Sequence, residues 1–460
     1  MSEQVWIARL QEILGPSKVL TSIEDRIAYS YDGTFAQQLP DVAVLPESTE
    51  EVAAVVRVAA EYRVPVVPRG MASGLAAASV PFSGGIALSI NRMNRILELD
   101  EVNRTVRVEA GIITADLQAY VEARGLFYPP DPSSNKHSTI GGNIACNAGG
   151  PRCLKYGVTG DYVMGLTVVL PDGRILQTGG KAIKNVVGYD LTSLFIGSEG
   201  TLGVITEALL KLIAKPQYVR TALAEFPSLD GASRTVNAIL SAGVVPATLE
   251  LMDETAIACI EDAMRLGLPL DVEAMLIIET DGSDEEAVRR EMETVERVCQ
   301  ENGARRVTVA RNEAERAQLW RARRSVSPSL ARKAPNKLGE DITVPRSAIP
   351  EAIRRIKEIS ARYGLPIVIF GHAGDGNLHP NILFDKRDPA QWEKVEVMAG
   401  EIFGVALDLG GTLSGEHGVG TLKRPYMERA LGPVSIDVQR RIKQALDPLN
   451  IMNPGKVLPE

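Results

Sequence analysis

The stretch PPDPSSNKHSTIGGNIACNAGGPRCLKYGVTGD, residues 129–161, decides how the first half of this 460-residue chain is interpreted. Glycines, small polar residues and prolines follow one another there without the period of a helix or a strand. An irregular stretch of this length inside a compact domain is usually functional. Its small residues would let backbone amides and the side chains of Thr139, Asn143 and Asn147 surround a bulky ligand. A mobile surface loop is the alternative, although such loops are usually more charged.

The sequence before this stretch alternates between strand and helix patterns. From 41 to 110, an apolar strand, a helix that begins at the capping sequence Ser48 to Glu51, and a second strand lead into PRGMASGLAAASVP, residues 68–81. A glycine-rich turn directly after a strand is where backbone N–H groups can meet a phosphate. The glycine spacing matches neither the dinucleotide-binding nor the P-loop pattern, so on its own this segment is interpreted as a structural turn.

The sequence after the stretch returns to strand patterns. A β-hairpin is predicted around the turn Pro171, Asp172, Gly173. It is followed by GSEGTLG, residues 197–203, which places Glu199 in a turn. A carboxylate in such a turn is more often a capping acceptor than a catalyst.

The composition excludes several classes of protein. With 45% hydrophobic and 23% charged residues, the chain has the composition of a globular protein with two or three domains. Its net charge of -8 provides no electrostatic footprint for nucleic acid. The four cysteines lack the C-x-x-C spacing of a zinc ribbon or iron–sulfur cluster, which fits a reducing cytosol. No apolar run approaches the length of a membrane span, so we expect a cytoplasmic protein whose only membrane contact would be peripheral, through partner subunits.

Three of the four histidines lie in two short motifs, FGHAGDGNLHP at 370–380 and SGEHGVG at 414–420. Imidazole is both a common metal ligand and the side chain suited to acid–base chemistry near neutral pH. Two histidines and Glu416 would suit zinc, iron(II) or manganese with positions left open for a substrate. Glycine-rich turns whose histidines merely cap or hydrogen-bond are the alternative, which one motif alone would leave equally good. Two motifs together favour a site.

After Lys215 and Pro216, strand and helix segments alternate. This pattern predicts an α+β domain whose helices cover one face of a sheet. A helical pattern that begins at Glu313 carries Arg323 and Arg324. An arginine pair on a helix is usually solvated, but a planar guanidinium can also bind a carboxylate through two parallel hydrogen bonds.

The first half closely resembles the FAD-binding domain of the vanillyl-alcohol-oxidase (PCMH-type) flavoproteins. The matching segments are VVPRGMASG, PPDPSS, STIGGNIACNAGG, KYGVTGDYV and GSEGTLGVIT, which follow the family's order over roughly 40 to 215. The resemblance implies an α+β protein with a two-part FAD-binding domain at 1–215, an α+β cap domain with an antiparallel sheet at 216–430, and a C-terminal segment at 431–460 that returns to the FAD domain.

The same resemblance implies which residues line the cofactor. Those of the PRGxxSG segment would hold the pyrophosphate. The implied set is Arg69, Gly70, Ser73, Gly74, Leu75, Asp131, Ser134, Thr139, Gly141, Gly142, Asn143, Ala148, Gly149, Gly150, Gly157, Glu199, Gly203, Ile205 and, from the closing LNIMNPGK, Asn453. Met71, Ala72 and Leu75 stand where some relatives carry a histidine that tethers the flavin, so the FAD is expected to be non-covalent.

The second half is similar to the cap domain of the family's 2-hydroxyacid dehydrogenases, of the glycolate oxidase and D-lactate dehydrogenase type. That similarity implies that His372, His379 and Glu416 bind a divalent metal and that His417 abstracts the hydroxyl proton. It places the substrate carboxylate at Arg323, with Arg324 as an alternative because the register is soft. Asn381 matches a position that contacts the substrate in some members.

The implied activity is the FAD-dependent oxidation of glycolate or D-lactate to the 2-oxo acid, with hydride transfer to flavin N5. The alternatives are a non-catalytic electron-relay subunit of a hydroxyacid oxidase complex, a D-2-hydroxyglutarate-type dehydrogenase, and a metallohydrolase. Without cluster-type cysteine spacing, the reduced flavin needs another acceptor: an iron–sulfur subunit, an electron-transferring flavoprotein, a quinone or oxygen. A homodimer or a hetero-oligomer is compatible with this activity.

Overall fold

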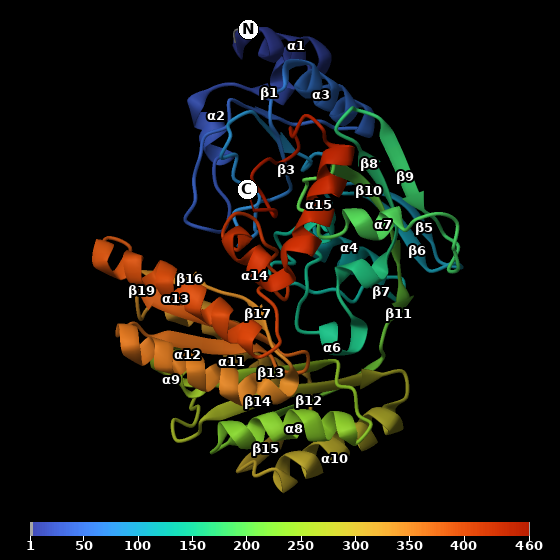
Figure 1. The fold of residues 1–460 in the computed structure, drawn as a ribbon. Helices are drawn as coiled ribbons and strands as arrows, with labels where there is room; N and C mark the ends of the chain where they lie inside the picture. Colours follow the sequence, from blue (N-terminus) through green and yellow to red (C-terminus); the bar gives the residue numbers. More distant parts are fainter. Residues whose placement is uncertain (1–2, 460) are drawn as a thin grey trace. The chain divides into compact units, whose positions relative to one another are not determined.

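The computed structural model describes residues 3–459 and contains two compact units (Figure 1). The first unit comprises the chain up to Gly149, Val158–Lys215 and the chain from Glu416 onward. The second comprises Gly150–Gly157 and Pro216–Gly415. Among the described residues, no helix combines the length and the hydrophobicity that a membrane span requires.

The first unit begins with a four-stranded sheet. Its strands, in spatial order, are β1 (Val19–Leu20), β2 (Val42–Val44), β4 (Ile86–Ser89) and β3 (Val66–Arg69). Strands β2 and β3 both run parallel to β4, and α3 (Thr49–Tyr62) connects β2 to β3. The predicted helix start is confirmed, because the Ser48 side chain accepts a hydrogen bond from the Glu51 N–H. The helices α1 (Glu3–Leu14) and α2 (Ile23–Ala28) precede this βαβ arrangement.

A second, antiparallel sheet of five strands completes the core of the first unit. Its order is β5 (Ile96–Asp100), β6 (Thr105–Glu109), β10 (Val204–Lys211), β8 (Val163–Val169) and β9 (Ile175–Gly179). The predicted hairpin is β8–β9, closed by the Gly173 N–H donating to the Leu170 carbonyl at 2.8 Å. Further elements of this unit are α4 (Thr114–Glu122), β7 (Leu126–Phe127), α7 (Leu191–Phe195), β11 (Ile213–Ala214), α14 (Met427–Leu431) and α15 (Pro433–Leu446).

The stretch 129–161 is more ordered than its sequence predicted. It contains α5 (Ile140–Cys146) and α6 (Cys153–Tyr156), so the expectation of a segment without helices was wrong. Both helices are too short to give a helical period, and the two glycines of α5 have low helix propensity. Tertiary packing explains one of them: a Cβ on Gly141 would lie 2.7 Å from the Ala110 Cβ.

The second unit is built on one antiparallel sheet, as predicted. Its path is β15 (Arg306–Val309), β12 (Tyr218–Phe226), β14 (Ala274–Gly282), β13 (Thr248–Asp253), β18 (Ile367–His372), β19 (Asn377–Phe384) and β16 (Asn336–Gly339), with β17 (Ile342–Thr343) also paired to β19. Strands β18 and β19 form a hairpin in which Phe370 pairs with His379. This hairpin brings the two histidines of the 370–380 motif onto neighbouring strands.

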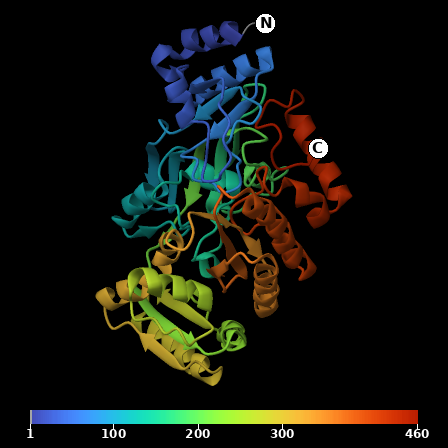
Figure 2. The same ribbon diagram turned by 90° about the vertical axis from the view of Figure 1, so that its left-hand side faces the viewer.

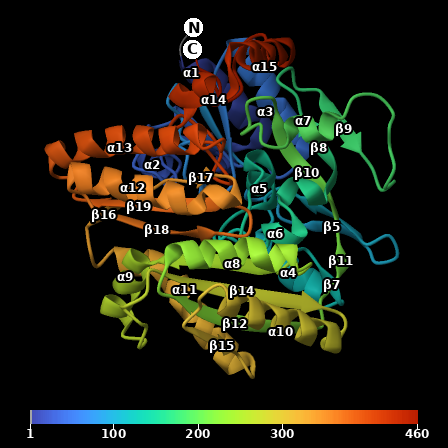
Figure 3. The same cartoon turned by 60° about the horizontal axis from the view of Figure 1, so that its bottom comes forward.

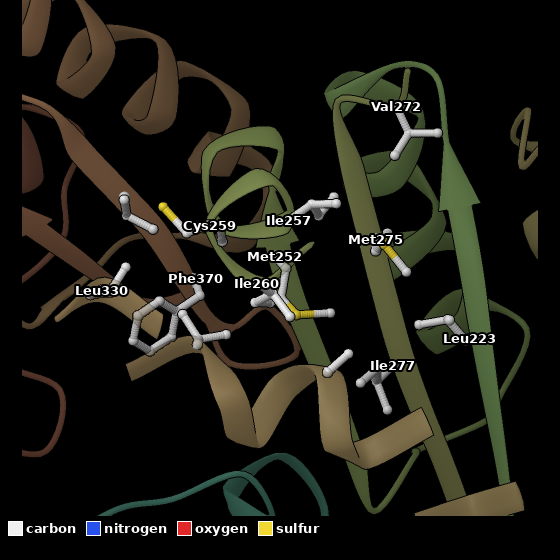
Figure 4. Packing of buried hydrophobic residues seen from close by; sticks show 14 of the residues in the cluster. Leu223, Met252, Ile257, Cys259, Ile260, Val272, Met275, Ile277, Leu330 and Phe370 are labelled. Atoms are coloured by element: carbon white, nitrogen blue, oxygen red, sulfur yellow. The ribbon is translucent and has the colours of Figure 1, made fainter. Parts of the chain in front are cut away.

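Helices cover both faces of this sheet, which corrects the prediction of helices on one face. The helices α9 (Glu254–Met264) and α11 (Glu313–Leu330) pack on the face that carries Met275 and Ile277 (Figure 4). Phe226 is paired with Ala274, so it points to the opposite face, where Gly231 of α8 (Leu229–Ser241) lies against its ring. The helix α10 (Glu285–Glu301) packs against α8. The continuous apolar run of β14 is the pattern of a strand that is buried on both sides.

The helices α12 (Ile349–Tyr363) and α13 (Pro389–Asp408) lie side by side (Figure 2). They cover β18 and β19 on the side away from α9 (Figure 3). The strands of the histidine motif are therefore enclosed on both faces, and His372 and His379 are buried.

The limits of the two units differ from the expected 1–215, 216–430 and 431–460, although the division at Lys215 coincides. Residues 150–157 pack with the second unit, because Lys155 and Tyr156 donate hydrogen bonds to the Asp281 carboxylate. The second unit ends at Gly415 because the chain beyond it is hydrogen-bonded to residues of the first unit, such as the Thr421 N–H to the Ala76 carbonyl.

Asp253 provides a test of this packing. It caps α9 by accepting a hydrogen bond from the Ala256 N–H, and burial raises the pKa of its carboxyl to about 6. Because the folded chain holds this proton more tightly than the unfolded chain, stability decreases as the pH rises from about 4 to about 6, by at most roughly 3 kcal/mol. Asp253→Asn keeps the capping oxygen, so we expect it to raise Tm more at about pH 8 than at about pH 5.

The control is Asp388→Asn, which changes a half-buried cap of the same kind on α13. Thermal unfolding at the two pH values measures both variants. An equal Tm difference between Asp253→Asn and wild type at both pH values would contradict the assignment of a buried, destabilising charge.

Candidate functional site

A cavity that is partly open to solvent lies in the first unit, at the carboxyl ends of its parallel strands. Arg69 ends β3 and is paired in register with Ser89, which ends β4. This end of a parallel sheet is where open α/β structures bind ligands. The cavity is lined by Pro68, Arg69, Gly70, Ala78, Ser79, Ile90, Gly141, Gly142, Ala145, Cys146, Glu199, Gly200, Gly203, Val204 and Ile205.

Three buried polar atoms at or just after the ends of β3 and β4 make no hydrogen bond within the described residues: Arg69 Nε, Ser89 Oγ and Asn91 Oδ1. Of these residues, Arg69 lines the cavity. Buried polar groups normally have a partner, so unpaired atoms that cluster at one strand end indicate a ligand. The terminal nitrogens of Arg69 already donate to the Tyr29 and Tyr31 carbonyls, at 2.6 and 3.1 Å. Arg69 can therefore offer a ligand its Nε and its main chain, and burial lowers the pKa of its guanidinium.

The walls of the cavity are main chain brought unusually close together. A Cβ on Gly70 would lie 2.2 Å from Thr139 Oγ1, which caps α5 by accepting the Gly142 N–H. Ala72 and Ala77, in the loop after β3, both have positive φ, at 53° and 60°. Small residues on both sides thus expose backbone to the cavity, which fits a long polar cofactor such as FAD.

Glu199 connects this cavity to the segment that carries His417. The Glu199 backbone has a φ of 50°, and its side chain is buried. Its two carboxylate oxygens accept the Val419 and Gly420 N–H groups, at 2.6 and 2.8 Å. Burial raises the pKa of Glu199, and these two donors act in the opposite direction. The carboxylate therefore fixes the turn that immediately follows His417. The contact with FAD that was predicted for Glu199 would then be made by its other atoms.

The C-terminal segment is hydrogen-bonded to residues that line the same cavity. Asn453 Nδ2 donates to the carbonyls of Glu199 and Ala78, at 2.7 and 3.0 Å. Lys456 Nζ donates to the carbonyls of Ala77 and Val80, and burial lowers its pKa to about 7. Sequence reasoning singled out Asn453 but missed Lys456, although both belong to the LNIMNPGK motif.

The two buried histidines of the second unit face one another. His372 and His379 have ring planes at 84° and Nε2 atoms 3.4 Å apart. His372 Nδ1 lies 2.5 Å from Glu250 Oε1, so Nδ1 carries the proton of this hydrogen bond, and in the neutral ring the lone pair is then on Nε2. The Nε2 separation is long for a hydrogen bond. It matches the spacing of about 3.3–3.4 Å expected for two ligands of a tetrahedral ion with bonds of about 2.0–2.1 Å.

Glu416 follows Gly415, so one peptide bond keeps its Cα about 3.8 Å from that of an anchored residue. The anchor is Asp341, whose Oδ2 accepts the Gly415 N–H at 2.9 Å. One ligand atom from each of the three predicted ligands, the two histidines and this glutamate, lies within 4.8 Å of the others. Two imidazoles and one carboxylate form a donor set that fits a divalent transition metal.

Glu250 and Asp341 are two further residues that sequence reasoning missed. Glu250 is fully buried on β13 and accepts hydrogen bonds from both His372 and Arg323. Burial alone would raise the pKa of Glu250, but the charges of these two partners lower it below its usual value. Asp341 is equally buried and accepts from Asn377 Nδ2 and Ser414 Oγ. A glutamate inside the apolar run TLELMD was the available signal for Glu250.

Arg323 lies on α11 with its side chain only 13% exposed. Its Nε donates to Glu250 Oε2 at 2.7 Å, and its guanidinium stacks over the Phe370 ring. The structure gives its two terminal nitrogens no partner within the described residues, so they can receive a carboxylate. The alternative, Arg324, stacks on the Trp320 ring instead.

The other predicted residues have varied positions. Asn381 is buried on β19 and donates to the His379 carbonyl at 2.8 Å. Asn143 is also buried, and its side chain donates to Thr114 Oγ1 as part of the scaffold. Gly150 and Gly157 bound the segment that packs with the second unit. The predicted FAD residues outside the lining of the first-unit cavity are Ser73, Gly74, Leu75, Asp131, Ser134, Thr139, Asn143, Ala148, Gly149, Gly150, Gly157 and Asn453.

Comparison with known families gives two matches. The model described as "FAD linked oxidases, C-terminal domain" matches residues 215–457, and the model described as "FAD binding domain" matches residues 40–179. The first match alone spans more than half of the chain.

Known proteins are similar over nearly the whole chain. The glycolate oxidase subunit GlcD of Bacillus subtilis (strain 168) is 48% identical over 98% of this chain and 96% of its own length. The D-lactate dehydrogenase of Anaerostipes hadrus is 36% identical over 98% of this chain and 96% of its own length. The structure of a 4-ethylphenol oxidase from Gulosibacter chungangensis covers 100% of this chain and 98% of its own length, with a TM-score of 0.82 and 19% identity. The last similarity concerns the fold alone.

The loop after β3 leads to a prediction about the cofactor. Because residues 70–75 contain no histidine, no imidazole there can form a bond to the flavin ring. We therefore expect the purified chain to be yellow and to release all of its FAD on acid precipitation, measured as absorbance in the supernatant. Flavin retained in the washed precipitate would contradict a non-covalent cofactor.

Proposed function

The chain belongs to the family of FAD-linked oxidases, and we propose that it oxidises a small 2-hydroxy acid, glycolate or D-lactate, to the 2-oxo acid. The observation that carries this proposal is the pair of facing imidazoles, with Nε2 atoms 3.4 Å apart, connected through Glu250 to a buried arginine. This arrangement suits a substrate that has a hydroxyl group next to a carboxylate. The relatives named glycolate oxidase subunit and D-lactate dehydrogenase support the same class of substrate.

The cofactor is FAD, which when bound supplies the acceptor for the hydride that leaves C2 of the substrate. The first-unit cavity supports its placement, because Arg69 Nε is unpaired in the lining and many of the lining residues are small. Ser89 Oγ and Asn91 Oδ1 are also unpaired, on either side of the lining residue Ile90 in the sequence. The chain's own contribution is to bind the cofactor and to keep the loop near His417 fixed through Glu199.

His372, His379 and Glu416 are proposed to hold a divalent metal: zinc, iron(II) or manganese. Their donor atoms support this assignment, since the three lie within 4.8 Å of one another. A bound dication would polarise the substrate hydroxyl and lower its pKa. The hydrogen bond from His372 Nδ1 to Glu250 keeps the other ring nitrogen available for the ion.

Arg323 and His417 are proposed to act on the substrate itself. The two terminal nitrogens of Arg323 can bind the carboxylate as a planar fork. His417 takes the hydroxyl proton on a ring nitrogen while its own backbone is held by the turn at Gly418 to Gly420. Asn381 is proposed as a further substrate contact, and its burial beside His379 supports that role.

The electron acceptor is proposed to be a partner: an iron–sulfur subunit, an electron-transferring flavoprotein or a quinone. A hetero-oligomer is favoured by an exposed loop after β9, in which Ile183, Val186, Val187 and Tyr189 are 93%, 97%, 88% and 95% exposed. Exposed apolar side chains grouped in this way mark interaction surfaces. The printed name of the Bacillus subtilis relative also describes a subunit. Such partners would also account for peripheral association with a membrane.

A non-catalytic electron-relay subunit is the alternative. Such a subunit needs the flavin cavity, but its electron transfer does not require two facing imidazoles or a largely buried arginine. Buried charges are costly to maintain, so their presence favours a catalytic chain.

His417→Ala tests the proposed base. We expect this variant to keep its FAD and its metal, because His417 lies in neither the cavity lining nor the ligand set. Flavin reduction by glycolate or D-lactate should slow by at least about 10²-fold, the usual contribution of a general base. Anaerobic stopped-flow absorbance measures the rate.

The matched control is His137→Ala, which removes the fourth histidine of the chain from an exposed position. It should reduce flavin at the wild-type rate. An unimpaired rate in His417→Ala with intact FAD content would contradict the role of His417.

A further inference from the structure

Two buried glutamate–arginine pairs join α11 to the central sheet of the second unit. Glu279 on β14 is 3% exposed and pairs with Arg316, and Glu250 on β13 is fully buried and pairs with Arg323. The two arginines are seven residues apart, which places them on the same face of the helix. The two pairs are therefore alike in sheet, helix and chemistry.

The pairs differ in the remaining contacts of the carboxylate. Glu279 accepts its other hydrogen bonds from two residues outside the proposed site, through Thr221 Oγ1 and Trp320 Nε1. Glu250 is completed by His372 Nδ1, on a histidine whose Nε2 faces His379. Only Glu250 thus connects an arginine with a histidine of the proposed metal site, and each of its two oxygens has a different partner.

We propose that Glu250 is a positioning residue that couples metal binding to recognition of the substrate carboxylate. One oxygen fixes the ring orientation and the tautomer of His372, and the other fixes the Arg323 fork at its Nε. This inference rests on the proposed function and adds to it a residue that touches neither the substrate nor the ion.

The geometry predicts what each change at this position does. In Glu250→Gln, the side chain has one acceptor oxygen and one NH₂ group, while both partners, His372 Nδ1 and Arg323 Nε, are donors. Either one of the two partners loses its hydrogen bond, or His372 changes to the tautomer whose Nε2 carries the proton and cannot bind a metal. In Glu250→Asp, the charge is kept, but the side chain is one methylene shorter and cannot reach both partners at once. The two variants therefore separate the effect of charge from the effect of position.

The first measurement is metal affinity, on the full-length chain with FAD bound. The chain is stripped with a chelator and titrated with Mn²⁺, and free Mn²⁺ is followed by electron paramagnetic resonance. We expect Glu250→Gln and Glu250→Asp to weaken Mn²⁺ binding by about 10- to 100-fold, as for other residues that orient metal-bound histidines. The controls Glu279→Gln and Glu279→Asp should bind Mn²⁺ as wild type does.

The second measurement is substrate recognition at saturating Mn²⁺. Steady-state turnover with an artificial electron acceptor is recorded against substrate concentration, and we expect KM to rise at least about 10-fold in both Glu250 variants, because the Arg323 fork is no longer held. Glu279→Gln and Glu279→Asp should change thermal stability without changing KM. If Glu250→Gln fails to fold, Glu250→Asp provides both measurements.

Two results overturn the inference while leaving the proposed function intact. One is a set of Glu250 variants that match their Glu279 counterparts in both Mn²⁺ affinity and KM. The other is a change in Mn²⁺ affinity with KM unaltered, which would show that the two sites are not coupled. A wild-type chain that neither binds Mn²⁺ nor reduces its flavin with any 2-hydroxy acid overturns the proposed function, and the inference with it.

Discussion

A buried carboxylate must have its oxygens paired, and this requirement organises the functional segments of both units. An unpaired charge in the interior costs several kcal/mol, so each buried carboxylate holds in place the groups that donate hydrogen bonds to it. Glu199 accepts hydrogen bonds from the N–H groups of Val419 and Gly420. Glu250 accepts hydrogen bonds from His372 and Arg323. Asp341 accepts hydrogen bonds from the Gly415 N–H, Asn377 Nδ2 and Ser414 Oγ. The side chains proposed for catalysis are thus held by acids that do not take part in it.

This arrangement explains how glycine-rich turns can carry a precise site. The turns are rich in glycine, and Gly418 and Gly420 both have a positive φ, which glycine adopts more readily than other residues. Their positions come from the carboxylates that accept their backbone N–H groups, and a charged acceptor makes such hydrogen bonds stronger than neutral ones. The same principle applies to the cavity in the first unit, where Asn453 and Lys456 hold the loop after β3 by donating to its carbonyls. Preorganisation of this kind lowers the cost of orienting substrate and cofactor.

Sequence reasoning predicted the parts of the structure that have local signals. The strand AMLIIETDG and the capped helix after Ser48 were found because their residues follow clear patterns. The approach of His372 to His379 was indicated by the motif, since its glycines let the chain turn tightly and bring polar side chains together. The helix α5 was missed because seven residues with two glycines contain no usable period. Glu250 was missed because a charge inside an apolar strand is normally assigned to the solvent face, and only the tertiary structure places Arg323 opposite it.

The central claim is that FAD oxidises a 2-hydroxy acid with the help of a metal held by the two facing histidines. The most direct measurement is anaerobic bleaching of the flavin by a panel of D- and L-2-hydroxy acids, with the chain as purified, after treatment with a chelator, and after the metal is restored. The account predicts rapid bleaching by glycolate or D-lactate, its loss after chelation with FAD still bound, and its return with Zn²⁺, Fe²⁺ or Mn²⁺. Bleaching that is equally fast after complete removal of metal, or absent with every hydroxy acid, would contradict it.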